Sequence, residues 1–385
     1  MSDKVIEKPS VRATTQNVSL GQGDGLRRLI GFIGADNLSL IFALIGLILL
    51  ITIVSGWFGL TGGNYFFTWQ NLMNSLAQSI VIVGLLSVGE SPVIIAGALD
   101  ISVGSLSSVG SVVSASALIG VGTVGALHIL PTDSVIVAIF AGIAACAIAG
   151  AINGLIVTRL RVNPIIATLG TLAAFAGVAF LLAPDGKPIG VGTHPDFTYL
   201  ADGRFLSGLH VPPLGGSHWT GIPVLSVIFV IVAILVHVLM TYTDFGRAIY
   251  AIGGNATAAR LAGINVSRVR MLMYVLSGGI AGLAGVLLSA RTTSGNPVNG
   301  VGLELQAITA VFLGGAATTG GRGTIMGTFL AVIMVGALNN GMNLLGFDTF
   351  IQQVALGLLL IAAVAISQWR QARAERARTR VAAHG

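Results

Sequence analysis

The sequence predicts an all-α polytopic membrane protein with about ten transmembrane helices, on three observations. The 385 residues are 54% hydrophobic and only 9% charged, and their mean hydropathy is +0.90. A soluble domain carries about 25% charged residues, so this chain lacks the charge to cover a soluble surface. Apolar runs long enough to cross a bilayer core of about 30 Å recur along the chain. Basic residues gather in alternate connections between these runs.

The apolar runs predict ten crossings, several of them short or rich in glycine. They are Leu38–Leu60, Leu72–Val88, Ile101–Gly120, Val135–Val157, Pro164–Leu182, Ile222–Met240, Val269–Ser289, Leu305–Ala317, Thr324–Leu338 and Phe350–Ile366.

The basic residues predict the orientation of the chain. With the N-terminus inside, 17 of the 20 lysines and arginines fall in cytoplasmic segments, and only Lys187, Arg204 and Arg291 fall outside. This asymmetry predicts an even number of spans and both termini in the cytoplasm. The expected organisation is a cytoplasmic tail over 1–36, a transmembrane domain over 37–368 with an external loop at 184–221 and a cytoplasmic loop at 242–268, and a basic cytoplasmic tail over 369–385.

The external loop 184–221 is long for a bare connection between two spans. It contains five of the eleven prolines of the chain. We expect either a folded lip or docking surface here, or a variable insertion.

Two short segments suggest an inverted repeat. Ala151–Leu155, in the fourth crossing, resembles Ala337–Gly341, in the ninth, and these two crossings run in opposite directions. Repeats of opposite topology are a common plan of transport proteins. Chance similarity between apolar helices is the alternative.

A broken helix is predicted around residues 90–105. Pro92 removes a helix hydrogen bond, Gly97 loosens the chain, and two acids, Glu90 and Asp100, bracket the stretch. Asp100 stands just before a new helical run that includes Ser102, where its carboxylate can accept bonds from free N–H groups. Asp100 is therefore either a helix cap or a contact for a polar substrate.

Polar side chains within the apolar runs mark either a substrate pathway or hydrogen bonds between helices. Amides and acids suit an uncharged hydroxylated solute such as a sugar. The candidates for a pathway or broken-helix role are Asn74, Gln78, Glu90, Asp100, Ser102, Asn153, Glu304, Gln306, Asn339 and Asn340.

Several chemistries find no support in the sequence. No G-x-x-x-x-G-K-[ST] motif is present, so the chain has no phosphate-binding loop of this type. The six histidines are dispersed without metal-ligand spacing, and the single cysteine, Cys146, has no partner for a disulfide. No pairing of a nucleophile with a base is visible. We therefore predict no catalytic residue, no metal ligand and no enzyme activity, and the scattered basic residues do not indicate nucleic-acid binding.

The cytoplasmic loop contains the most specific pattern. Asn255 can cap a short helix, and Gly263 can end it in the left-handed conformation. A short helix held between two spans has the shape of a docking element for another protein. The alternative is an amphipathic turn that rests on lipid headgroups.

These motifs resemble a known family. Gly97–Ser105 resembles the G-G-I-D-L-S-V-G-S stretch of permease subunits in ribose-, xylose- and fructose-type ABC importers, in the superfamily of branched-chain amino acid and monosaccharide permeases. Gly246–Asn265 is similar to their G-R-x-x-Y-A-x-G-G-N-x-x-A-A-R-x-x-G-I-N segment. Leu303–Ile308, Gly314–Gly323 and Leu338–Asn343 fit as well.

The resemblance covers roughly residues 70–368 and leaves out the tails and the loop 184–221. The chain departs from the family pattern at Ala98 and Leu99, which replace Gly-Ile before the aspartate. It also has Glu90 where a neutral or variable residue is expected.

The resemblance implies a permease subunit of a prokaryotic inner membrane that imports a monosaccharide or similar polyol by alternating access. An external binding protein would deliver the substrate, a second permease copy would complete the pathway, and two cytoplasmic ATPase subunits would hold the ATP and Mg. The chain itself would bind no cofactor and would contact membrane lipid. The residues that would couple to the ATPase are Gly246, Arg247, Gly254, Asn255, Ala258, Ala259, Arg260, Gly263 and Ile264.

A different class of transporter also fits the intramembrane acids. Glu90, Asp100 and Glu304 could titrate in a proton- or sodium-coupled secondary transporter. The sequence leaves open whether the substrate is a pentose, a hexose, an inositol or a furanose-like signalling molecule, and whether the second permease is identical.

Overall fold

The computed structural model describes residues 35–57, 66–119, 123–124, 127–128, 134–192 and 194–382. The predicted tail 1–36 lies outside these residues except for its last two. The described part is predominantly helical. Its strands form three antiparallel two-stranded ribbons: β1 (Thr123–Val124) with β2 (Leu127–His128), β3 (Ile189–Gly190) with β6 (Ser294–Gly295), and β4 (Arg204–Phe205) with β5 (Ile222–Pro223).

The helices follow the predicted apolar runs with additional short elements. In chain order they are α2 (Ala35–Trp57), the π-helix η1 (Gln70–Leu76), α3 (Ala77–Ile95), α4 (Val103–Ile119), α5 (Val135–Thr158), α6 (Pro164–Leu182), the 3-10 helix η2 (Pro184–Gly186), α7 (Pro195–Asp202), α8 (Val224–Tyr242), α9 (Asp244–Leu261), α10 (Val266–Arg291), α11 (Leu303–Leu313), α12 (Ile325–Leu344) and α13 (Thr349–Ala382).

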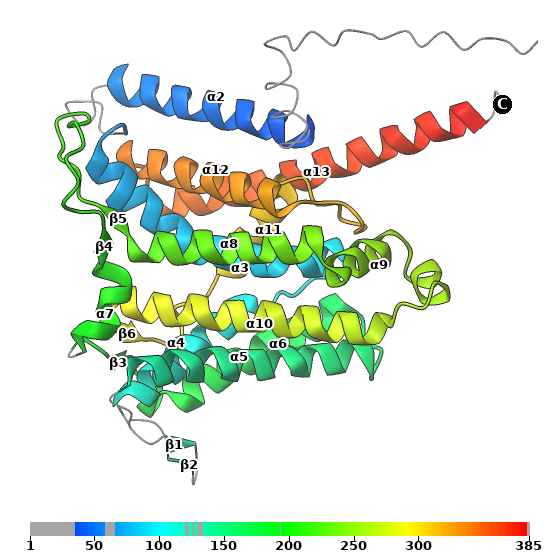
Figure 1. Ribbon diagram of the computed structural model, residues 1–385, viewed down its shortest axis with the longest axis horizontal. Helices are drawn as coiled ribbons and strands as arrows, with labels where there is room; N and C mark the ends of the chain where they lie inside the picture. The colour runs from blue at the N-terminus through cyan, green and yellow to red at the C-terminus, as the bar shows by residue number, and fades with distance from the viewer. Residues whose placement is uncertain are drawn as a thin grey trace, which may run out of the picture.

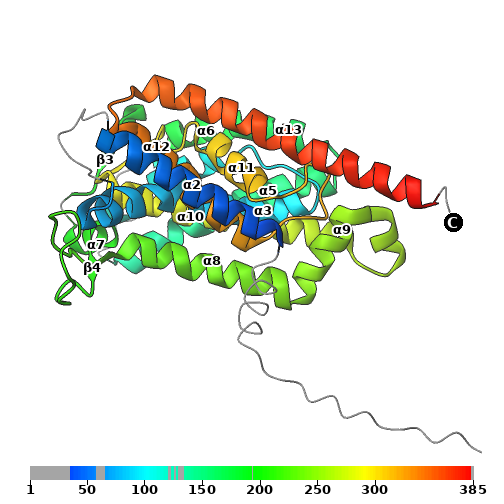
Figure 2. The same ribbon diagram turned by 90° about the horizontal axis from the view of Figure 1, so that it is seen from above.

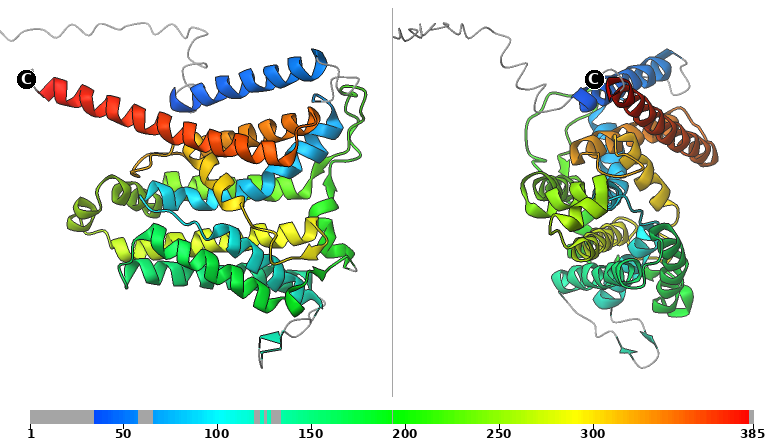
Figure 3. Two further views of the ribbon diagram at one scale, coloured as in Figure 1. Left: turned by 180° about the vertical axis from the view of Figure 1, so that it is seen from behind. Right: turned by 90° about the vertical axis from the view of Figure 1, so that its right-hand side faces the viewer.

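The long helices lie roughly side by side and form a bundle (Figure 1). Figure 1 shows α7 and strands β3 to β6 at one end of the bundle and α9 projecting at the other. We call these the α7 end and the α9 end. Seen along the bundle, α5 and α6 lie on the side opposite α2 and α13 (Figure 3).

The core lies around α3 and α10. Of the apolar window in η1 and α3, 83% is buried, against 11% in α2. Small residues let α10 approach α5: a Cβ on Gly278 would lie 2.4 Å from the carbonyl oxygen of Cys146, and a Cβ on Gly150 would lie 2.2 Å from that of Tyr274. Without a hydrophobic force between helices in lipid, such close backbone packing supplies the attraction that holds them together.

The described residues contain ten apolar helical segments. Seven are long enough to cross a bilayer, and the three shorter ones are Val103–Ile119, Leu303–Leu313 and Thr349–Ala365. The run predicted as a full crossing at Leu305–Ala317 is the shortest of them, because α11 has 11 residues and is about 16 Å long. Non-helical chain precedes it and lies against α4, where Gly300 donates its N–H to Ser108 Oγ at 2.9 Å.

The predicted broken helix is present, but Pro92 does not cause the break. Helix α3 continues through Pro92 to Ile95, and the non-helical segment is 96–102. Proline lacks an N–H and crowds the preceding turn, but the helix after it is intact, since the Pro92 carbonyl still accepts the N–H of Ala96 at 3.0 Å. The turn itself comes at Gly97, whose φ of +78° favours glycine.

The order of elements has the form of an inverted repeat. Helix α3 runs from the α7 end to the α9 end and is followed by non-helical chain, the short helix α4 and the long helices α5 and α6. Helix α10 runs the opposite way and is followed by non-helical chain, the short helix α11 and the long helices α12 and α13. The two similar sequence segments lie on α5 and α12, which correspond in this order.

The loop 184–221 is folded. It holds η2, β3, α7 and β4, and the ring of Phe197 is fully buried. Helix α7 packs against α10 and α8. Trp69, beside η1, donates its indole N–H to the Pro212 carbonyl at 2.9 Å. The segment is therefore a cap on the α7 end.

Helix α13 runs without a break from Thr349 to Ala382, about 51 Å. It extends past the neighbouring helices at the α9 end (Figure 2). The boundary predicted at 368/369 therefore falls inside one continuous helix.

Candidate functional site

The break after α3 is held by a buried cluster of acids and amides. The Glu90 carboxylate accepts the backbone N–H of Asp100 at 2.7 Å. Asp100 Oδ1 in turn accepts the N–H of Ser102 at 3.0 Å and its hydroxyl at 2.5 Å. Asn153 of α5 donates to Ser102 Oγ at 2.7 Å and to both Asp100 oxygens at 3.3 and 3.4 Å. The structure thus brings four of the predicted residues together at the start of α4.

Helix α10 adds two residues that the sequence analysis missed. Ser277 donates its hydroxyl to Glu90 Oε2 at 3.5 Å. Tyr274 is fully buried, and its hydroxyl has no hydrogen-bond partner within the described residues. The sequence signal that could have identified Ser277 and Tyr274 is a hydroxyl group within an otherwise apolar run.

In the conformation described, the cluster stabilises the non-helical segment between α3 and α4. Glu90, Asp100, Ser102 and Asn153 are all 0% exposed, so a substrate reaches them only if the surrounding helices move. Their hydrogen bonds tie the non-helical segment to α3 and α5. A buried polar group without a partner is costly, so these contacts stabilise the break in the middle of an apolar bundle.

Glu304 lies at the corresponding place in the second half, in the first turn of α11. Its Oε2 is buried against α4, only 2.0 Å from where a Cβ on Gly104 would stand. This oxygen has no hydrogen-bond partner among the described residues. Gln306 follows on the same helix and is partly buried. Glu304 is therefore near the start of α4 but is not hydrogen-bonded to the Asp100 cluster.

The predicted amide Asn340 belongs to a separate buried pair. Asn71 donates to Asn340 Oδ1 at 2.9 Å, and Asn340 donates back to Asn71 Oδ1 at 2.8 Å. This pair joins η1 to α12, and Asn71 was missed from the sequence. The neighbouring Asn339 has a buried Oδ1 that lacks a partner in the described part of the chain.

Asn74 and Gln78 lie toward the α7 end. Asn74 Oδ1 accepts the hydroxyl of Thr220 at 3.4 Å, which connects η1 to the cap. The backbone carbonyl of Gln78 accepts from the Arg291 guanidinium at 3.2 Å. The ten candidates for a substrate pathway therefore fall into several groups and do not line one common site.

The candidate docking element is α9, which consists of two helical arms that meet at Asn255. Asn255 has φ −162° and ψ +102°, outside the helical region. Its Oδ1 accepts the N–H groups of Thr257 and Ala258, both at 3.0 Å, and so caps the second arm. Gly263, at φ +86°, ends that arm, and Ile264 donates its N–H to the Ala259 carbonyl at 3.0 Å.

The second arm presents an open outer face. Its inner side chain, Ala259, is buried with Ile252 and Val266. Leu261 is 86% exposed, a large value for an apolar side chain. Leu261 was not among the predicted coupling residues. The exposed members of that set in this region are Gly254, Asn255, Ala258, Arg260 and Gly263.

The first arm is attached firmly to the bundle. Gly246 lies so close to α8 that a Cβ there would be 2.1 Å from the Met240 carbonyl oxygen. Arg247 forms an exposed ion pair with Asp244 one turn earlier. Tyr250 donates its hydroxyl to the Gly323 carbonyl at 2.8 Å, and burial raises the pKa of this phenol, so that it remains a donor.

The junction of the two arms touches the break after α3. A Cβ on Gly253 would lie 1.9 Å from the carbonyl oxygen of Ile95 and 2.4 Å from the N–H nitrogen of Gly321. Gly321 also donates this N–H to Ile95 at 2.8 Å. Gly320, at φ +84°, lies against Gly97 at the start of the non-helical segment. The junction of α9 is therefore in direct backbone contact with both the end of α3 and the loop before α12.

Comparison with known proteins identifies the family. Residues 71–364 match the family described as "Branched-chain amino acid transport system / permease component". The chain is 38% identical to a ribose import permease protein of Escherichia coli (strain K12) over 86% of this chain and 94% of the relative. It is also 38% identical to a ribose import permease protein of Bacillus subtilis (strain 168), over 78% and 86% respectively.

An L-arabinose transport system permease protein of Escherichia coli (strain K12) is 34% identical over 78% of this chain and 83% of the relative. No solved structure gives a significant match. The matched region contains both the buried cluster and α9, and it confirms the family expected from the motifs. The chain therefore belongs to the family of permease components represented by the sugar permeases of ABC importers.

Proposed function

We propose that this protein is the membrane-spanning permease subunit of an importer for a monosaccharide, driven by ATPase subunits that dock on α9. The observation that supports this most directly is the form of α9. It is a two-armed element with an exposed outer face that lies between two spans and projects from the bundle (Figure 1). The sequence contains no phosphate-binding loop of the G-x-x-x-x-G-K-[ST] type.

The contacts of α9 suggest how a docked ATPase would act on the permease. Closure of the ATPase subunits on ATP would move the second arm, and the Gly253 junction would pass that movement to Ile95 and Gly321. Ile95 is the last residue of α3, and the buried Asp100 cluster lies just beyond it. The bundle would then open toward the α7 end, accept sugar from an external binding protein and return after hydrolysis.

The substrate class follows from relatives that are permeases for ribose and L-arabinose. Neutral hydroxylated solutes are bound through amides and shielded acids, the groups that this bundle buries. We propose that the pathway forms between this chain and a second permease copy in a prokaryotic inner membrane, with both termini in the cytoplasm. Under this proposal the α9 end faces the cytoplasm.

The alternative of a proton- or sodium-coupled transporter rests on the contact between Glu90 and Asp100. The Glu90 carboxylate accepts the backbone N–H of Asp100, so both acids are buried in one cluster, where either carboxyl group could carry a proton. Such a transporter would concentrate sugar without any ATPase and would stop when an ionophore collapses the proton or sodium gradient. The proposed importer would do neither.

A thiol-labelling experiment tests the docking role. The single cysteine, Cys146, is buried, so a new surface cysteine reacts selectively. We expect Ala258→Cys to react with a membrane-impermeant maleimide in inside-out vesicles and to be protected when the ATPase subunits are added. A matched variant, Ser207→Cys in the exposed cap, should react only in right-side-out vesicles and should show no such protection.

Two outcomes would contradict the proposal. One is labelling of Ala258→Cys from the outside. The other is equal labelling with and without bound ATPase, measured on a complex whose assembly is confirmed by co-purification.

A further inference from the structure

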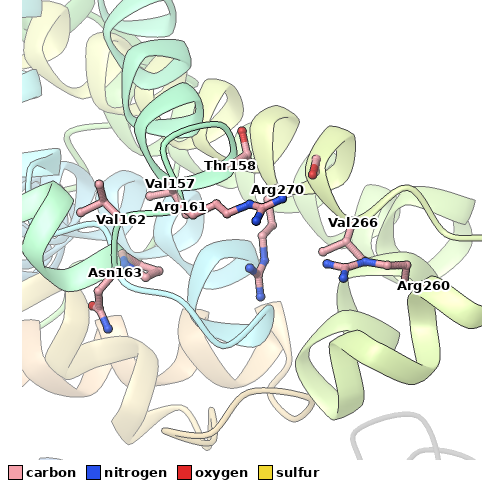
Figure 4. A pocket seen from close by; sticks show the side chains of 10 residues that line it. Val157, Thr158, Arg161, Val162, Asn163, Arg260, Val266 and Arg270 are labelled. Atoms are coloured by element: carbon pink, nitrogen blue, oxygen red, sulfur yellow. The ribbon is translucent and has the colours of Figure 1, made fainter.

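We propose that a pocket at the α9 end is a binding site for a phosphate oxyanion, supplied by the headgroup of an acidic membrane lipid. The pocket has a volume of about 600 Å³ and lies where α5 ends and α6 and α10 begin (Figure 4). Its lining residues are Val157, Thr158, Arg161, Val162, Asn163, Pro164, Arg260, Val266, Ser267 and Arg270.

The pocket concentrates positive charge without a counter-charge. Arg161, Arg260 and Arg270 line it from three different segments, and no carboxylate is among the lining residues. In Figure 4, Arg161 and Arg260 reach toward each other from opposite sides, with Arg270 between them. The two ion pairs of the described residues involve other side chains. Three guanidinium groups around one space repel each other until an anion enters.

Arg270, one of the lining residues, has a donor without a partner. Its Nε is buried and has no hydrogen-bond partner among the described residues. A buried N–H of a charged group is expensive to leave without an acceptor. Guanidinium groups bind phosphate oxygens through paired, charge-assisted hydrogen bonds, so a phosphate in contact with the Arg270 guanidinium would supply the kind of acceptor that this side chain lacks.

The backbone also favours an anion. The N-termini of α6 and α10 both border the pocket, at Pro164 and Val266, and the positive ends of their dipoles add to the arginines. Arg161 itself has φ +56°, a conformation that glycine adopts far more easily. The chain therefore places a long cationic side chain at a position where backbone energy alone would favour glycine.

The position of the pocket favours a lipid over a soluble anion. The spans Val135–Thr158 and Pro164–Leu182 end and begin at lining residues, which puts the pocket at headgroup depth. Beside it, Leu160 is 70% exposed and Ile166 is 66% exposed, as expected for side chains that face acyl chains. Basic pockets between helices at this level bind anionic headgroups.

The test compares lipid retention by the full-length protein in mixed micelles of phosphatidylglycerol and phosphatidylcholine, measured by native mass spectrometry. We expect the wild type to retain phosphatidylglycerol preferentially. Loss of one guanidinium contact, in Arg161→Gly or Arg270→Gln, should weaken this retention about tenfold. Arg161→Gly also relieves the strain of a positive φ at a non-glycine residue. Without lipid, the unfolding temperature of this variant should therefore be no lower than that of the wild type.

Arg159→Gln is the matched control, because Arg159 is an exposed arginine two residues away that does not line the pocket. It removes the same charge and should leave retention unchanged. Competition by millimolar inorganic phosphate would also support the oxyanion site but would identify a free anion as its ligand. Equal retention by the wild type, Arg161→Gly and Arg270→Gln, without competition by phosphate, would overturn the proposal. The proposal would also be overturned if Arg161→Gly and Arg270→Gln lowered the affinity for the ATPase subunits and left lipid retention unchanged. The pocket would then bind an acidic side chain of a partner protein.

Discussion

Replacement of Gly253 by alanine tests the mechanical link between α9 and the bundle. The new Cβ would stand 1.9 Å from the Ile95 carbonyl oxygen and 2.4 Å from the nitrogen of Gly321. Both obstacles are backbone atoms, so no side-chain rotation relieves them. Because non-bonded carbon and oxygen need a separation of about 3 Å or more, α9 and the end of α3 must move apart by roughly 1 Å.

That separation has an energetic consequence. Overpacking of a tight contact costs about 1–3 kcal/mol. The hydrogen bond from Gly321 to Ile95 spans the same contact, and its loss adds about 1 kcal/mol. We therefore expect Gly253→Ala to destabilise the protein by about 2–4 kcal/mol in thermal unfolding in detergent. In the assembled transporter, ATP hydrolysis should continue while sugar uptake falls, because α9 no longer presses on α3.

The adjacent glycine supplies the control. A Cβ on Gly254 meets nothing within 4 Å, so Gly254→Ala should fold normally and gain about 0.4–1 kcal/mol from the reduced freedom of the unfolded chain. If Gly253→Ala matched Gly254→Ala in both stability and uptake, the close contact at Gly253 would not transmit motion and the reasoning would be refuted.

Three further tests probe polar contacts of buried and half-buried side chains. Asp100→Ala should reduce folding yield and transport more than Asp100→Ser, since serine retains an oxygen acceptor and loss of the acceptor costs about 1–3 kcal/mol; equal losses, measured by purification yield and uptake, would indicate a requirement for charge instead. Asn71→Ala and Asn340→Ala should each destabilise by about 1–3 kcal/mol, and the double variant by less than their sum, in a thermal-unfolding cycle; strict additivity would contradict the pairing. Tyr250→Phe should lose about 1 kcal/mol through its bond to Gly323. Because burial raises the pKa of Tyr250 in the folded state, the wild type should also lose stability as pH rises above about 10, and Tyr250→Phe should lose less.

The fold class and the family could be predicted from the sequence because the relevant signals are local. Apolar length predicts a span, and the Asn255–Gly263 pattern predicts a capped, short helical arm, which the second half of α9 has. The position of the first break could not be predicted as well. Pro92 is a stronger local signal for a helix break than Gly97. A helix nevertheless tolerates one proline when the neighbouring residues keep their hydrogen bonds, and the chain turns instead at Gly97, which has a left-handed backbone conformation.

The grouping of the polar residues depended on contacts between distant segments. Hydropathy marks Glu90, Asn153 and Asn340 equally as polar groups in apolar runs. Only the packing of α3, α5 and α10 brings the first two into one cluster, and only the packing of η1 on α12 pairs the third with Asn71. Likewise, the anion pocket brings together Arg161 and Arg260, which are about a hundred residues apart in the sequence, so no short sequence motif could have predicted it.

The most direct test of the central claim is the uptake of radiolabelled ribose and L-arabinose into proteoliposomes. The preparations compared contain the protein alone, or the protein with its ATPase subunits and binding protein. We predict that sugar is concentrated only in the complete system, only with ATP on the ATPase side, and equally well in the presence of a protonophore. Concentrative uptake by this chain alone, abolished by the protonophore, would contradict the account.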